Sequence, residues 1–311
     1  MIHGPRLLRN AATCALLWAA ACTSASAQYP TFKAGIELVQ IGVTVTDRKG
    51  GLVTDLEPED FEIFEEGKRQ SLSYFAPGMA GDAEGPPLHL GLLLDVSGSM
   101  GGAMSFTKTA AVKFLNTLTD AVDITVVTFD TEVRVARYSQ NEFVRAIERI
   151  RQQKAVGYTA LNDAIGVYLD GAAELDGRKI MLIYTDGSDT TSALPFRELI
   201  EVAKASDVTI YPIGALEYLP QSARLEARRT LTQLASTTGG QAFFPMSVKD
   251  LDQFYEKVLA EIRAQYTIGY VSTSPATDGA WRDVEVRIGG KAGSQYRVRA
   301  RRGYYGPYKK P

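Results

Sequence analysis

Two acids and three hydroxyl side chains, spread over three segments of the chain, could together bind a metal cation. Asp95, Ser97 and Ser99 fall in LLLDVSGSMGG, Thr159 falls in AVGYTALNDAI, and Asp186 falls in YTDGSD. Oxygen ligands with no histidine or cysteine suit a hard cation, Mg²⁺ above all, with Mn²⁺ or Ca²⁺ as alternatives. Because hydroxyls are weak ligands and two carboxylates only balance the charge, such a site would keep water and leave a position for an outside acidic group.

The segments around these residues predict that they meet at one edge of a sheet. The run LHLGLLLD is continuously apolar up to Asp95, which is typical of a strand covered on both faces. A second buried strand, Ile180–Thr185, ends just before Asp186, and Thr159 lies in a glycine-containing loop ahead of a helical segment. Ligands of open α/β sheets bind beyond the carboxyl ends of the strands, so we expect a site there.

A catalytic role for Asp95, Ser97 and Ser99 has less support from the sequence than a cation site. Beyond the first 27 residues the only histidine is His89, six residues before Asp95 on the same strand. At about 3.3 Å per residue it would lie about 20 Å from the serines, too far for a Ser-His-Asp triad. No Gly-x-Ser-x-Gly or Gly-Lys-Ser/Thr motif is present. We therefore expect no enzyme.

Three alternatives stay open at this point. One is a hydrolase or phosphoryl-transfer enzyme with Asp95 as nucleophile, although such enzymes usually carry a second acid where this chain has Ser97. Another is an envelope scaffold whose metal site is structural. The third is a plain turn, because Ser and Gly are common after strands. Asp130 and Asp189 lie near the predicted edge too and are interpreted as loop or helix-cap acids.

The first 27 residues have the pattern of a secretory signal peptide. Arg6 and Arg9 precede an apolar run, and Ala25-Ser26-Ala27 fits a cleavage site. The run is shorter than the ~20 residues that a membrane span needs. We expect export to the periplasm, the outer membrane or the medium, with no transmembrane span in the mature chain. Ala19-Ala20-Ala21-Cys22 also loosely resembles a lipoprotein processing site, so a lipid anchor at Cys22 is an alternative.

Composition and periodicity predict the domain layout. Apolar residues make up 45% and charged residues 23% of 311, as in globular proteins, and the net charge of −2 gives no indication of nucleic-acid binding. Strand and helix patterns alternate over 88–263, which indicates an α/β fold with a doubly wound, mostly parallel sheet. Period-2 patterns on both sides predict a small all-β sandwich into which this domain is inserted. The predicted segments are a signal peptide (1–27), an N-terminal β segment (28–77), a linker (78–87), the α/β domain (88–263), a C-terminal β segment packing with 28–77 (264–305) and a tail (306–311).

Three shorter segments carry strand predictions. KRQSLSYF and QYRVRARRGYY are each expected to form one strand, and QAFFP is expected to form an edge strand.

The motifs DVSGSM, GYTALNDAI and TDGSD, in this order, resemble the von Willebrand factor A domain and its metal-ion-dependent adhesion site. The resemblance covers about residues 87–263 and includes all five motif positions. It implies that Ser97, Ser99 and Thr159 contact Mg²⁺ through their hydroxyls, while Asp95 and Asp186 act through water and hydrogen bonds. It also implies a protein partner that offers an Asp or Glu carboxylate to the ion. The flanks resemble a group of exported bacterial proteins with a von Willebrand factor A-related domain, abundant in acidobacteria.

Overall fold

The computed structural model describes residues 38–78, 86–118, 120–217, 219–274, 277–290 and 293–308. The predicted signal peptide, Cys22, most of the predicted linker and the last three residues lie outside the described residues. Within the described part, no helix combines the length and the apolar character needed to cross a bilayer.

A five-stranded sheet forms the centre of the α/β domain, in the order β7-β6-β5-β8-β9. Strands β5, β6, β8 and β9 are parallel, and β7 is an antiparallel edge strand. All residues of β5 are buried, as its apolar run predicts. The bounds are β5 (Leu88–Asp95), β6 (Ala121–Phe129), β7 (Val133–Ser139), β8 (Arg178–Thr185) and β9 (Thr209–Gly214).

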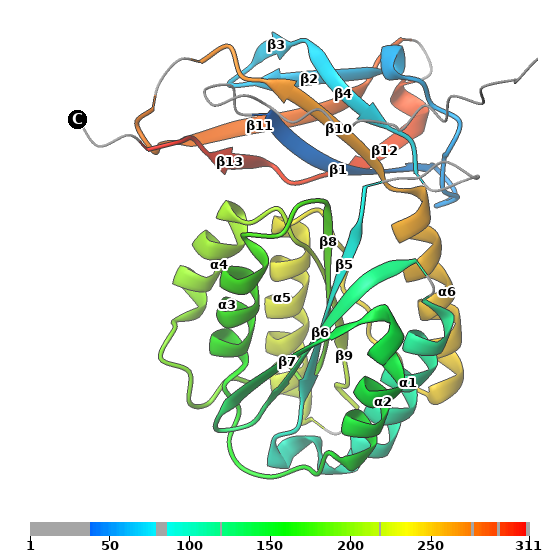
Figure 1. Ribbon diagram of the computed structural model, residues 1–311, viewed down its shortest axis with the longest axis vertical. Coiled ribbons are helices and arrows are strands. Elements are labelled where there is room, and N and C mark those ends of the chain that lie inside the picture. Colours follow the sequence, from blue (N-terminus) through cyan, green and yellow to red (C-terminus); the bar gives the residue numbers. More distant parts are fainter. Residues whose placement is uncertain are drawn as a thin grey trace, which may run out of the picture. The chain divides into compact units, whose positions relative to one another are not determined.

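Helices cover both faces of this sheet (Figure 1). One hydrophobic core lies under α1, α2 and α6 and takes Leu92 from β5, whereas the other lies under α3, α4 and α5 and takes Leu93. The α-helices are α1 (Met104–Thr117), α2 (Phe143–Gln152), α3 (Leu161–Ala172), α4 (Phe196–Ala205), α5 (Gln221–Thr237) and α6 (Val248–Ala264). Short 3₁₀ turns occur at η1 (Pro58–Asp60), η2 (Gly98–Gly102), η3 (Gln140–Glu142) and η4 (Gly293–Gln295).

A glycine sets the close approach of α3 to the sheet. A Cβ at Gly91 in β5 would lie 2.3 Å from the ring of Tyr168 in α3, so only glycine fits here. Because α3 begins directly after the loop that carries Thr159, this packing helps to position that loop over the end of β5.

The flanking segments form two antiparallel sheets with the orders β12-β1-β10-β4 and β13-β11-β2-β3. Each sheet contains strands from both ends of the chain, and apolar side chains from both sheets share one core, which includes Val43, Ile63, Ile268 and Val286. The strands are β1 (Leu38–Asp47), β2 (Phe61–Glu65), β3 (Lys68–Gln70), β4 (Leu72–Ala76), β10 (Tyr266–Val271), β11 (Trp281–Ile288), β12 (Tyr296–Arg299) and β13 (Gly303–Tyr305). The predicted fold class is therefore confirmed: a mostly parallel sheet between helices, with antiparallel sheets from both flanks.

Three strand predictions were wrong in detail. KRQSLSYF breaks at Ser71, and its two halves, β3 and β4, belong to different sheets. QYRVRARRGYY breaks in the same way between β12 and β13. QAFFP makes only an isolated bridge from Phe243 to Ile213. Strand propensity is local, whereas a change of sheet depends on which partner strand lies beside each half.

Candidate metal centre

Asp95 ends β5 with its carboxylate fully buried among neutral hydrogen-bond donors. Oδ1 accepts a hydrogen bond from the Ser97 amide at 3.0 Å. Oδ2 accepts one from the Thr185 hydroxyl at 2.7 Å. The side chain is 0% exposed, and none of the described basic side chains forms an ion pair with it. Asp95 is thus held firmly, and it has no basic partner among the described residues.

The two serines follow on the η2 turn. The Ser97 and Ser99 hydroxyl oxygens lie 3.1 Å apart, with Ser97 buried and Ser99 exposed. Between them, the Gly98 amide donates to the Gly157 carbonyl at 3.0 Å, where an added Cβ would lie 3.2 Å from that oxygen. The glycine therefore lets the serine loop pack against the loop that carries Thr159.

Thr159 is buried on the loop between α2 and α3, and its backbone is fully bonded. Its amide donates to the Thr190 hydroxyl at 2.9 Å. Its carbonyl accepts from the amides of Thr190 and Thr191 at 2.8 and 3.1 Å. Three residues earlier in the same loop, the Val156 amide donates to the Val96 carbonyl at 2.8 Å. The Thr159 loop is thus tied to the Asp95 loop on one side and to the loop after β8 on the other.

Asp186 follows β8 directly and is 2% exposed. Its Oδ1 accepts from the Ser188 amide at 2.9 Å. Its Oδ2 is buried and has no hydrogen-bond partner. A carboxylate oxygen can only accept, so this atom needs a donor or a cation in place of the water it has lost.

The electrostatics of the site follow from this arrangement. Burial raises the pKa of Asp95 to about 7, and the nearby charge of Asp186 adds to the increase, while the bonds from Ser97 and Thr185 oppose it. Two buried acids without a basic partner repel each other and lose hydration. A cation between them would remove both penalties.

The residues present fit a hard divalent cation. Three hydroxyls and two carboxylates, one of which contains the unpartnered Asp186 Oδ2, offer only oxygen donors, which suit Mg²⁺ better than softer metals. Within the described part of the chain, no group of three or more His, Cys, Asp or Glu side chains is arranged to hold a metal. That result is expected for a site built mainly from hydroxyls.

Two neighbouring acids are used by the protein itself. The Asp130 carboxylate accepts hydrogen bonds from both terminal guanidinium nitrogens of Arg134 and from the Glu132 amide. Asp189 accepts from the Asn162 side chain at 3.1 Å and from the Ser192 hydroxyl at 2.6 Å. Both acids thus stabilise loops at the same edge of the sheet, in line with their interpretation from the sequence.

Sequence reasoning missed two threonines that hold the site together. Thr185 orients the Asp95 carboxylate, and Thr190 bonds both the amide and the carbonyl of Thr159. Thr185 could have been suspected from its place at the end of a buried strand beside Asp186. Nothing local marks Thr190, because its partner is 31 residues away.

A family comparison agrees with this geometry. Residues 89–257 match the model of the von Willebrand factor type A domain. The match spans more than half of the chain, and the chain belongs to this family. No curated protein shows significant similarity to it.

Several solved structures resemble parts of the chain, all with TM-scores below 0.5. A von Willebrand factor type A protein from Catenulispora acidiphila is 14% identical, covers 90% of this chain and 76% of its own, and has a TM-score of 0.46. The vWF domain of the type V pili tip protein Mfa5 from Porphyromonas gingivalis is 13% identical, covers 63% of this chain and 100% of its own, and has a TM-score of 0.46. Proximal thread matrix protein 1 from the mussel byssus, with a zinc-occupied MIDAS motif, is 18% identical, covers 61% of this chain and 49% of its own, and has a TM-score of 0.46.

Proposed function

We propose that this chain is an exported protein-binding protein that holds a partner's Asp or Glu side chain through a divalent cation. The cation site consists of Asp95, Ser97, Ser99, Thr159 and Asp186, and Mg²⁺ is the expected ion. The observation that carries the proposal is the buried Asp186 Oδ2 without a partner, close to the equally buried Asp95. Membership of the von Willebrand factor type A family supports it as well.

The family resemblance gives each residue a role in this proposal. Ser97, Ser99 and Thr159 offer hydroxyl oxygens as ligands, while Asp95 and Asp186 supply negative charge and orient the loops that carry the hydroxyls. When bound, the cation supplies a coordination position that a partner carboxylate can take. The extensive backbone bonding of the loops keeps the ligands in place, so little entropy is lost on binding.

Export and domain layout belong to the same proposal. Residues 1–27 would serve as the signal peptide, with a lipid anchor at Cys22 as the alternative. The mature protein would lie in the periplasm, at the outer membrane or outside the cell, as in the exported bacterial group that its flanks resemble. The proposed boundaries are 28–77 and 264–305 for the sandwich and 88–263 for the inserted domain.

A binding role is better supported than catalysis. His89 is the second residue of β5, and its ring nitrogens bond to the Asp123 carboxylate at 2.9 Å and to the Asp176 carbonyl at 2.9 Å. Asp95 lies at the other end of the same strand. The described residues therefore place no histidine beside the serines to activate them as nucleophiles.

A cation titration tests the site. We expect Mg²⁺ or Mn²⁺ to raise the melting temperature, with stabilisation of about 2.7 kcal/mol at 100 times Kd. Asp186→Ala and Ser99→Ala should abolish the increase. Ser105→Ala is the matched control, because Ser105 is exposed at the start of α1 and its hydroxyl makes no described contact with the site. A melting curve insensitive to cations would contradict the proposal.

A pull-down from envelope extract tests the binding role. We expect capture in Mg²⁺, release in EDTA, and no capture by Asp186→Ala. A complex that resists EDTA would instead support an envelope scaffold with a structural metal. Turnover of generic phosphate or ester substrates that is lost in Asp95→Asn would support the enzymatic alternative.

A further inference from the structure

An exposed apolar pair lies directly beside the candidate metal centre. Val156 and Tyr158 are 55% and 69% exposed and precede Thr159 in the chain. Two exposed basic residues, Arg151 and Lys154, come shortly before them. We call these four residues the Tyr158 face.

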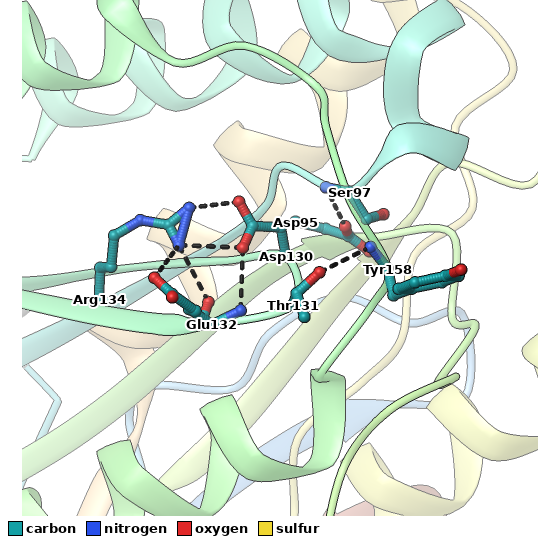
Figure 2. Close-up of polar contacts among 7 residues, drawn as sticks. All are labelled: Asp95, Ser97, Asp130, Thr131, Glu132, Arg134 and Tyr158. Carbon is teal, nitrogen blue, oxygen red and sulfur yellow. Dashed lines mark hydrogen bonds and ion pairs between the residues drawn. The ribbon is translucent and has the colours of Figure 1, made fainter.

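The backbone beneath the Tyr158 face is held in place. The Tyr158 amide donates to the Thr131 hydroxyl at 3.0 Å, and Gly157 between the apolar residues has a φ of 76° that favours glycine. Figure 2 shows the Tyr158 amide directed at the Thr131 hydroxyl, and the adjacent Gly157 carbonyl accepts from the Gly98 amide of the serine loop at 3.0 Å. An exposed aromatic side chain on a fixed backbone loses little entropy on contact, which is typical of residues that dominate binding energy.

The turn that supports this face is itself locked by an ion pair. Asp130 and Glu132 both face Arg134 (Figure 2). The Asp130 carbonyl also accepts from the Ala160 amide at 2.8 Å. Thr131 and Asp130 thus accept hydrogen bonds from the amides of the two residues that flank Thr159, Tyr158 and Ala160. The same support therefore positions a ligand hydroxyl and the exposed aromatic ring next to it.

Charge differs between the two sides of the site. On the β6 side, neither Arg151 nor Lys154 has an ion-pair partner among the described residues. On the side of β8 and β9, a pocket of about 710 Å³ is lined by Asp189 and Glu226. A partner that brings a carboxylate to the cation gains attraction on the first side and meets repulsion on the second.

We propose that the Tyr158 face selects the partner: an acidic protein segment whose metal-binding Asp or Glu lies next to an aromatic or aliphatic side chain. That apolar side chain packs on Val156 and Tyr158, and further acids of the segment lie near Lys154 and Arg151. This inference rests on the proposed function, because the metal-bound carboxylate fixes where the segment lies.

Panning of a random peptide library tests the proposal. The full chain is immobilised in Mg²⁺, and bound phage displaying random 12-residue peptides are eluted with EDTA. We expect the enriched peptides to carry an aromatic or aliphatic residue within two positions of an Asp or Glu. The variant Val156→Ser with Tyr158→Ser should bind them at least about tenfold more weakly. Its affinity for Mn²⁺ and its melting temperature should match those of the unaltered chain.

The control combines Val122→Ser with Tyr308→Ser. Tyr308 is 69% exposed like Tyr158, and Val122 is 45% exposed at the opposite end of β6. This variant should bind the peptides as the unaltered chain does. Enriched peptides with only polar residues beside the acid, or equal binding by both double variants, would overturn the inference while leaving the cation-dependent function intact. A chain that binds Mn²⁺ but yields no peptide eluted by EDTA would overturn both.

Discussion

Buried carboxylates occur at both ends of the parallel sheet, but only one end neutralises them. At the amino end, the Asp123 carboxylate bonds to His89 at 2.9 Å and to Arg137 at 2.5 Å. At the carboxyl end, Asp95 and Asp186 accept hydrogen bonds only from amides and a hydroxyl. All three residues are at most 9% exposed, so burial does not explain the difference.

The comparison separates a structural end of the sheet from a functional one. Oδ1 of Asp123 lacks a hydrogen-bond partner, as Asp186 Oδ2 does, so the difference is one of charge: Asp123 pairs with Arg137 through Oδ2, and Asp186 has no basic partner among the described residues. A buried charge without a basic partner carries a desolvation cost that a cation can remove. Asp130 shows that not every acid at the carboxyl end lacks a partner, since it lies at the same edge as Asp95 but pairs with Arg134. Among the described residues at this edge, Asp95 and Asp186 are therefore the buried carboxylates without a basic partner.

The largest effect is expected from Asp123→Ala. It would leave His89 and Arg137 without their acid partner, and we expect the free energy of unfolding to fall by about 3 kcal/mol. Urea denaturation in EDTA measures it. Cation affinity should stay unchanged because the site is at the other end of the sheet. Loss of cation binding with unchanged stability would reverse the assignment of the two ends.

Asp95→Asn should act in the opposite direction on stability. The amide removes a buried carboxyl whose ionisation is opposed by burial, so in EDTA at a pH above its pKa of about 7 the free energy of unfolding should rise by about 1 kcal/mol. Calorimetric titration should show cation affinity reduced about 10- to 100-fold, as expected when a residue that orients metal ligands is altered. A loss of stability like that of Asp123→Ala would show that the two ends do not differ as proposed.

Thr131→Val should have the smallest effect. Valine keeps the shape but removes the acceptor for the Tyr158 amide, and one such bond contributes about 1 kcal/mol. We expect cation affinity, measured by calorimetry, to fall less than tenfold. Thr131→Ser keeps the hydroxyl and should restore it. Equal weakening by both substitutions would mean that the methyl group, and not the hydrogen bond, supports the loop.

Local patterns were sufficient for the elements of the inserted domain, except that QAFFP forms only an isolated bridge and not the expected edge strand. The apolar run from Leu88 to Leu94 predicted a strand buried on both faces, and β5 is buried throughout. In contrast, the breaks at Ser71 and between Arg299 and Gly303 were not predictable, because a strand changes sheet in response to distant partners.

The sequence by itself determined which side chains could bind a cation and where along the chain they lie, because donor chemistry and strand ends are local properties. Only the tertiary structure decided that Asp186 Oδ2 has no partner and that Asp123 has two. It also decided that Thr131 and Thr190 hold the loop around Thr159. Hydrogen bonds between residues far apart in the chain depend on which strands are neighbours, and that order follows from packing of the whole core.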